Sequence, residues 1–209
     1  MEPADQIAEA RSRAGESDSD KFNDRAAIII AVMAMLLAIT SLGGGNAAED
    51  IMNYNIRASD TWAFYQAKTI RQTSNRLAAD ALEAELRASQ NLLPEARAFL
   101  ESRIDEYRKT AERYEDEPDR EDPTNPLKGE GRKQLTARAR DFESQRDRAQ
   151  KQDPNFDFAE ALFQIAIVLA SVAILAGSRM ILRLSVVVGV LAALLMINGY
   201  FLFLPDLLG

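Results

Sequence analysis

LSVVVGVLAALLMINGYFLFLP, residues 184–205, is a run of 22 residues without a charged side chain. Val, Leu and Ala fill most of its first half, so a helix over this run is apolar on every side. A soluble core cannot cover such a helix. The hydrocarbon core of a bilayer is about 30 Å thick and needs roughly 20 helical residues. The run therefore predicts a membrane-spanning helix over residues 184–205.

Two other regions have the same character. Residues 26–48 and 161–178 carry no charge, and the first is densest in apolar residues over 26–42. We expect transmembrane helices over 26–45 and 156–178, with residues 1–25 as a polar N-terminal tail. A cleavable signal peptide is the alternative for the first run, but a leader with seven acidic residues is too acidic for one.

The composition excludes several classes of chemistry. The 209 residues include 25 Lys and Arg, 32 Asp and Glu, and neither His nor Cys. Disulfides, thiol nucleophiles and His-based triads are therefore absent. The acidic run over 115–122 lacks the ligand spacing of a calcium loop, so it predicts a solvated turn. We expect no metal, no cofactor, no nucleic-acid binding and no enzymatic activity.

Basic residues near the apolar runs predict the orientation. The short segment between the second and third spans carries Arg179 and Arg183, and the leader carries Lys21 and Arg25. The positive-inside rule places both on the cytoplasmic side, which puts residues 46–155 outside the cytoplasm. The reverse orientation stays open, because Arg148 and other basic residues precede the second span.

The middle of the chain, residues 46–155, reads as helical. It is rich in Ala, Arg, Glu and Leu, which favour helices, and it shows no strand-like alternation. Helices are expected over 46–91, 94–117 and 131–153, separated by a Pro-rich linker over 117–130. The chain must return to the membrane at Phe156. The fold class is therefore an all-α membrane protein with three transmembrane helices and a long antiparallel helical hairpin outside the bilayer.

Apolar residues seven apart favour coiled-coil-like pairing within this hairpin. Each expected helix has such a seam, and we expect the three seams to face one another. They are Ala63, Ile70, Leu77 and Ala84 in the first helix, Leu100, Tyr107 and Tyr114 with Ile104 and Ala111 between them in the second, and Leu135, Phe142 and Ala149 in the third.

Two groups of residues are candidates for contacts. The first surrounds the aromatic cluster of the polar region and could pack on a neighbouring helix or subunit; it comprises Trp62, Phe64, Tyr65, Gln66, Lys68 and Arg71. The second contains small or polar residues of the apolar runs, which bring helices together in lipid; it comprises Gln164, Ala170, Gly177, Gly189 and Asn198. The uncharged runs contain no ionisable pathway of the kind that active transporters use.

Several stretches resemble a family of small bacterial inner-membrane proteins that is classed only as a domain of unknown function. They are NDRAA at 23–27, LGG at 42–44, NAA at 46–48, ASDTWAFYQAKTIRQ at 58–72 and the segment 158–171. The resemblance implies three spans with a long helical insert in a bacterial inner membrane. It implies no catalytic residue and no ligand.

These features favour a structural role. We expect a non-enzymatic homo-oligomeric scaffold whose helical arms present an interaction surface, with the lipid bilayer and further copies of the chain as partners. A passive channel lined by Gln164, Asn198 or Thr40 is one alternative. An accessory subunit of another membrane complex, with an unknown protein partner, is the other.

Overall fold

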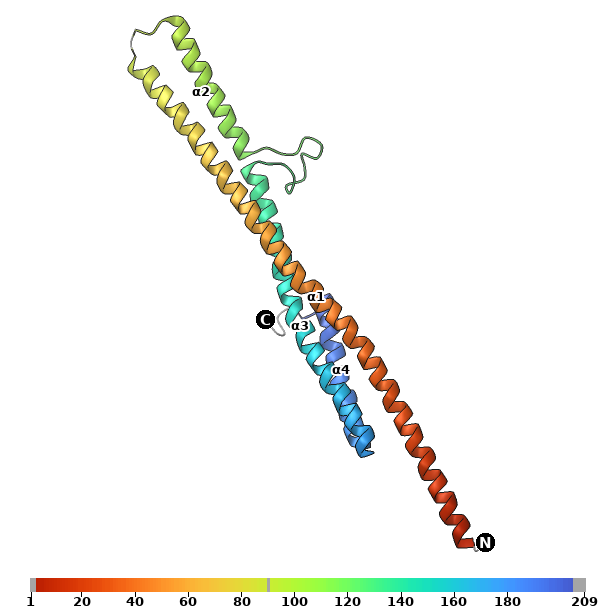
Figure 1. Ribbon diagram of the computed structural model, residues 1–209. Coiled ribbons are helices and arrows are strands. Elements are labelled where there is room, and N and C mark those ends of the chain that lie inside the picture. Colours follow the sequence, from red (N-terminus) through yellow and green to blue (C-terminus); the bar gives the residue numbers. More distant parts are fainter. Residues whose placement is uncertain (1–2, 90, 205–209) are drawn as a thin grey trace. The chain divides into compact units, whose positions relative to one another are not determined.

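The computed structural model describes residues 3–89 and 91–204, with side chains from residue 19 onward except at residue 90. The described residues form four helices, which are labelled in Figure 1: α1 (Pro3–Ala88), α2 (Pro94–Glu115), α3 (Arg132–Ala176) and α4 (Arg179–Phe201). That part of the chain contains no strand, which confirms the prediction of an all-helical fold. Three of the helices, α1, α3 and α4, are long and apolar enough to cross a membrane.

Two expected helix boundaries are wrong. α1 continues through Gly43, Gly44 and Gly45, so the first apolar run and the following polar helix form one element. α3 continues through Pro154, where the sequence predicted an end. A proline inside a helix removes one hydrogen bond and costs about 3 kcal/mol. The neighbouring Asn155 and Phe156 are buried, and this packing holds the helix together across the proline.

Several predictions concern residues at the two ends of the chain. Pro205, the last residue of the predicted third span, and the predicted outer tail over 205–209 lie outside the described residues. The side chains of the leader before residue 19 lie outside them as well.

The chain divides into two compact units. One combines Met1–Asp50 with Arg148–Gly209, and the other is Ile51–Asp147. We call them the apolar unit and the polar unit. α1 and α3 each contribute residues to both units.

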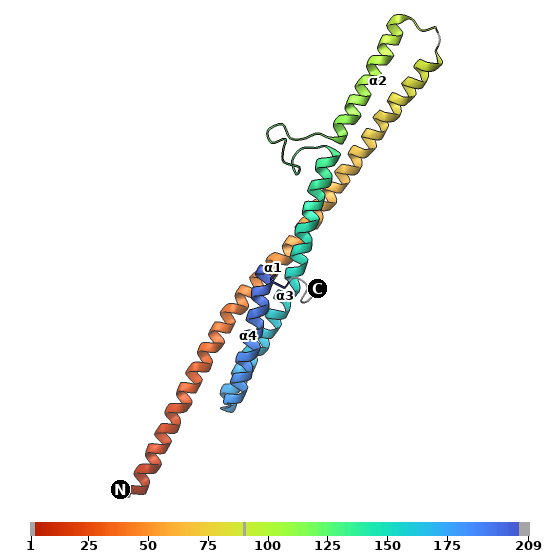
Figure 2. The ribbon, with the colours of Figure 1, turned by 180° about the vertical axis from the view of Figure 1, so that it is seen from behind.

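In the apolar unit, α3 and α4 lie side by side in both views (Figures 1 and 2). Met33 of α1, Phe163 and Ala166 of α3 and Ala192 of α4 form a buried apolar cluster. Glycine provides the space for a second contact, because a Cβ at Gly199 would lie 2.8 Å from the Phe156 ring. The three helices therefore meet through small residues and interlocking large ones.

In the polar unit, α2 and the start of α3 both pack on α1. Lys68, Gln72 and Glu83 of α1 contact Glu117, Ala111 and Arg108, respectively. Farther toward the start of α1, Trp62 contacts Glu143 of α3, and Tyr54 stacks on Phe142. Residue numbers fall on α2 as they rise on α1. On α3, Phe142 lies beside Tyr54 and Arg132 contacts Tyr65, eleven residues farther along α1. Both partners therefore run opposite to α1 within this unit. That this unit forms a hairpin outside a bilayer stays a prediction.

Residues 116–131 connect α2 to α3 in a loop whose two ends meet. The amides of Glu130 and Gly131 both donate to the Glu117 carbonyl, at 2.9 and 3.4 Å. Gly129 has a φ of +97°, a conformation that side chains other than glycine rarely adopt. Arg138 of α3 donates to the carbonyls of Leu127 and Gly129, at 2.8 Å each. α2 and α3 therefore follow one another along α1, and the loop departs from and returns to the junction.

The seam expected on α1 faces outward. Ile70 is 67% exposed and Leu77 is 63% exposed, so the prediction that they pair with α2 and α3 is wrong. The face that α1 buries passes instead through Ala58, the half-buried Tyr65, Gln72 and Ala79, which are also seven residues apart. The seams expected on α2 and α3 do include buried side chains, namely Ile104, Ala111, Leu135 and Ala149.

Candidate interaction surface

Gln72 connects three helices of the polar unit. It is 2% exposed, and its Nε2 donates to the Ala111 carbonyl at 3.0 Å and to Glu115 Oε2 at 2.9 Å. Its Oε1 accepts from Arg132 Nη1 at 2.6 Å, and the same nitrogen donates to Glu115 at 2.8 Å. Because Gln72 of α1 has two partners on α2 and one on α3, its amide fixes the register of all three helices.

Lys68 lies one helical turn before Gln72 and is also buried, at 4% exposed. Its Nζ donates to Glu117 at 2.9 Å and to Glu130 at 3.4 Å. It also lies 5.5 Å from the Phe64 ring centroid and 5.4 Å from that of Tyr114. A buried cation needs such partners to offset its lost hydration. Lys68 therefore holds both ends of the 116–131 loop against α1.

Two aromatic residues complete this face of α1. Trp62 Nε1 donates to Glu143 Oε1 at 2.9 Å, and its ring meets Tyr65 edge to face. The Tyr65 hydroxyl accepts from Arg132 Nη2 at 2.6 Å, and the guanidinium lies 4.9 Å from the ring centroid. Trp62, Tyr65 and Lys68 therefore make their contacts within the chain, against α2, α3 and the loop between them.

The charges at the junction are mutually stabilised. The hydrogen bond from Gln72, together with Arg132, lowers the pKa of Glu115 below its ordinary range, while burial acts in the opposite direction. Hydrogen bonds from Gln134 and Lys133 lower the pKa of Asp116. The Tyr65 hydroxyl and Glu115 raise the pKa of Arg132. The junction is thus most favourable when its carboxyl groups are ionised.

The remaining residues of the predicted cluster, Phe64, Gln66 and Arg71, are exposed on α1. They flank a row of exposed apolar residues seven apart that we call the outer stripe. The outer stripe comprises Ile56, Ala63, Ile70, Leu77 and Ala84. Within the polar unit, the described residues therefore cover one face of α1 and leave the outer stripe exposed.

The five residues predicted for helix contacts in the apolar runs have different surroundings. Ala170 is buried, and Gly189 makes room for Met33, since a Cβ there would lie 2.5 Å from the Met33 Cε atom. Asn198 donates to Asn155 Oδ1 at 2.8 Å, a partner that the sequence analysis missed. Gln164 is exposed beside Glu160, to which it donates at 3.3 Å. Gly177 faces open space with a φ of +59°, so it serves the turn after α3.

Neither the acidic run nor any other part of the described chain gathers three acidic residues in the arrangement of a metal site. The acidic side chains at the junction face Gln72, Gln134, Lys133 and Lys128. Gln72, Glu115 and Arg132 were not predicted from the sequence as one cluster. The step of seven from Ala58 through Tyr65 and Gln72 to Ala79 was the available signal, hidden by its polar members.

Residues 22–202 match a family described as a domain of unknown function, DUF4337. The chain belongs to this family. The match covers the first two apolar runs, the third as far as residue 202, the outer stripe and the α2–α3 junction. No curated protein and no solved structure matches the chain.

Proposed function

We propose that this DUF4337 protein is an integral membrane protein of the bacterial inner membrane that assembles with further copies of itself through the outer stripe. In this proposal the polar unit is an arm that presents an interaction surface, and the apolar unit is the anchor. The observation that carries the proposal is the exposed heptad row on a helix whose opposite face is already occupied.

The apolar unit supports membrane insertion by its exposed surface. The most apolar 18-residue windows of its three helices are only 17–28% buried. Val168, Leu175 and Leu194 are examples of large apolar side chains that no other part of the unit covers. Exposure of this extent is unfavourable in water and favourable in lipid. Resistance of the protein to extraction by alkaline carbonate tests this step; release into the soluble fraction would refute it.

The outer stripe supports self-association. A repeat of seven apolar residues is the pattern that lets two helices pack side by side along their length. Anchored copies enter one membrane with the same orientation, so the stripe can meet the same stripe of a neighbour. Alanines at 63 and 84 would allow close approach near both ends of the contact. Phe64, Gln66 and Arg71 would then lie at its rim.

The absence of cysteine makes cross-linking a direct test. A single Leu77→Cys substitution places a thiol on the outer stripe, and oxidation in the membrane is expected to yield a disulfide-linked dimer. Ser102→Cys, at an exposed position of α2, serves as the matched control and is expected to remain monomeric. Monomers at Leu77→Cys and also at Ile70→Cys would refute the proposed contact.

A second experiment separates association from folding. Leu77→Glu puts a charge into the proposed contact and is expected to reduce the particle mass in mild detergent. Phe99→Glu changes an equally exposed apolar residue of α2 and is expected to leave the mass unchanged. An unchanged mass for Leu77→Glu would count against the outer stripe as the interface.

A further inference from the structure

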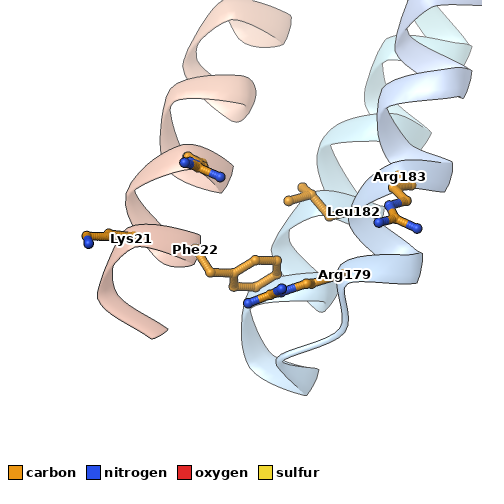
Figure 3. A pocket seen from close by; sticks show the side chains of 6 residues that line it. Lys21, Phe22, Arg179, Leu182 and Arg183 are labelled. Atoms are coloured by element: carbon orange, nitrogen blue, oxygen red, sulfur yellow. The ribbon is translucent and has the colours of Figure 1, made fainter. Parts of the chain in front are cut away.

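A basic pocket lies at one end of the apolar unit. Its cavity has a volume of about 300 Å³ and opens to the surface between α1 and α4. The lining residues are Lys21, Phe22, Arg25, Arg179, Leu182 and Arg183. Figure 3 shows Phe22 directed from α1 toward Arg179, with Leu182 and Arg183 along α4 above it and Lys21 on the far side of α1.

The position of this pocket follows from the sequence of the three apolar runs. Arg25 immediately precedes the first run, and Arg179 and Arg183 lie in the short connection between the second and third. The fold brings these separate segments together at one end of the apolar helices. If the helices span a bilayer, the pocket lies at the level of the lipid head groups.

The lining combines positive charge with apolar surface. Arg25, Arg179 and Arg183 are exposed arginines, and among the residues whose side chains the structure describes, no acidic one lines the cavity. Asp20 and Asp24 lie nearby in sequence on α1, are exposed, and do not line the cavity. Arginine binds phosphate oxygens through paired donors. Basic pockets between transmembrane helices bind anionic head groups for this reason.

We propose that this pocket binds the phosphate group of an anionic membrane lipid. The three arginines contact the phosphate, and Phe22 and Leu182 contact the apolar part of the same lipid. The inference rests on the membrane insertion proposed above and adds a ligand site to it. A free phosphate ion shares the recognised chemistry but would gain nothing from the two apolar side chains.

Lipid retention by the purified full chain in detergent tests this site. Native mass spectrometry would compare added dioleoyl phosphatidylglycerol with dioleoyl phosphatidylcholine, which carries no net charge. The wild type is expected to retain the anionic lipid preferentially. The triple variant Arg25→Gln, Arg179→Gln and Arg183→Gln is expected to lose that preference by about tenfold or more. The matched control changes three exposed arginines of the polar unit, Arg97, Arg120 and Arg140, to Gln and is expected to retain it.

Inorganic phosphate in a parallel sample separates the two sources of the anion. Retention that persists in millimolar phosphate assigns the site to the lipid, whereas competition shows that the phosphate group alone is recognised there. Equal retention of both lipids by the wild type, or equal loss in the two triple variants, would overturn the site. A carbonate-resistant protein with no lipid preference refutes this site alone. A carbonate-extracted protein that still prefers the anionic lipid refutes insertion alone.

Discussion

At the scale of single residues, the polar unit depends on side chains that are buried and hydrogen-bonded. Gln72 uses both amide hydrogens and its oxygen in contacts with Ala111, Glu115 and Arg132. Leaving buried polar partners unsatisfied costs about 1–3 kcal/mol per group. Loss of the Gln72 amide is therefore expected to destabilise the polar unit more than the size of this group suggests.

Gln72→Met tests this dependence. The side chain keeps its approximate volume but loses all three hydrogen bonds, so we expect the junction of α2 and α3 to open more often. Hydrogen exchange of the amides over residues 65–79 is expected to accelerate by about tenfold or more, as a loss of at least 1.4 kcal/mol implies. Thr73→Met, at the adjacent exposed position, is the control and should leave exchange unchanged. Equal protection in both variants would contradict the role of the amide.

The depressed pKa of Glu115 predicts a response to acid. A carboxyl whose pKa is lower in the folded chain stabilises the fold above the ordinary value of 4.5. That stabilisation is lost as pH falls through the lower, folded value. We expect Glu115→Gln to reduce the drop in melting temperature between pH 7 and pH 3.5, measured by circular dichroism in detergent. Glu121→Gln, in the exposed loop, should leave the drop as it is; a smaller drop there as well would point to a general charge effect.

At the scale of helices, the three consecutive glycines of α1 have different roles. A Cβ at Gly43 would lie 2.6 Å from the Phe156 ring and 2.9 Å from the Tyr200 hydroxyl oxygen, whereas a Cβ at Gly45 would meet open space. Consecutive glycines can mark either a hinge or a close approach between helices. The helix is continuous here, and the close approach is made at Gly43.

Alanine substitutions separate these roles. Gly43→Ala is expected to destabilise the apolar unit by about 1–3 kcal/mol, because the added methyl group overpacks the contact with Phe156. Gly45→Ala is expected to be neutral or to stabilise the helix by up to about 1 kcal/mol. Thermal unfolding of both variants in the same detergent provides the comparison. The interpretation fails if Gly43→Ala melts at or above the temperature of Gly45→Ala.

A helix or a buried face could be predicted from the sequence where its own residues decide it, and could not where the residues packed against it decide it. The apolar runs were evident from the absence of charge, since a bilayer-spanning helix needs no particular neighbour. The buried face of α1 was not, because Gln72 reads as solvated until Glu115 and Arg132 are placed beside it. Lys68 was predicted as a contact residue, but without its partner Glu117. Ile70 and Leu77 form a regular row and gave the stronger but wrong signal for the internal seam. Pro154 was read as an end because propensity alone omits the packing of the residues after it.

At the scale of the whole molecule, the orientation in the membrane is the property that basic residues should control. Arg25, Arg179 and Arg183 come from separate segments and line one pocket, as expected if the leader and the α3–α4 connection share one side. On this basis the 116–131 loop would lie on the other side, outside the cytoplasm.

Thiol labelling of intact bacterial cells tests the orientation. A membrane-impermeant maleimide is expected to label Thr124→Cys in the loop and to leave Ser19→Cys, before the first span, unlabelled until the cells are opened. Both substituted positions are exposed, and the parent chain has no thiol of its own. The opposite pattern would establish the reverse orientation, with the arm in the cytoplasm.

The closed base of the 116–131 loop has a practical consequence. The amides of Glu130 and Gly131 bond to the Glu117 carbonyl and so hold the two ends of the loop together. Residues can therefore be added between 117 and 130 without moving α2 or α3. Insertion of a fluorescent reporter at Thr124 would leave the framework undisturbed. The same geometry would let natural sequences differ in length at this point while the helices on either side keep their register.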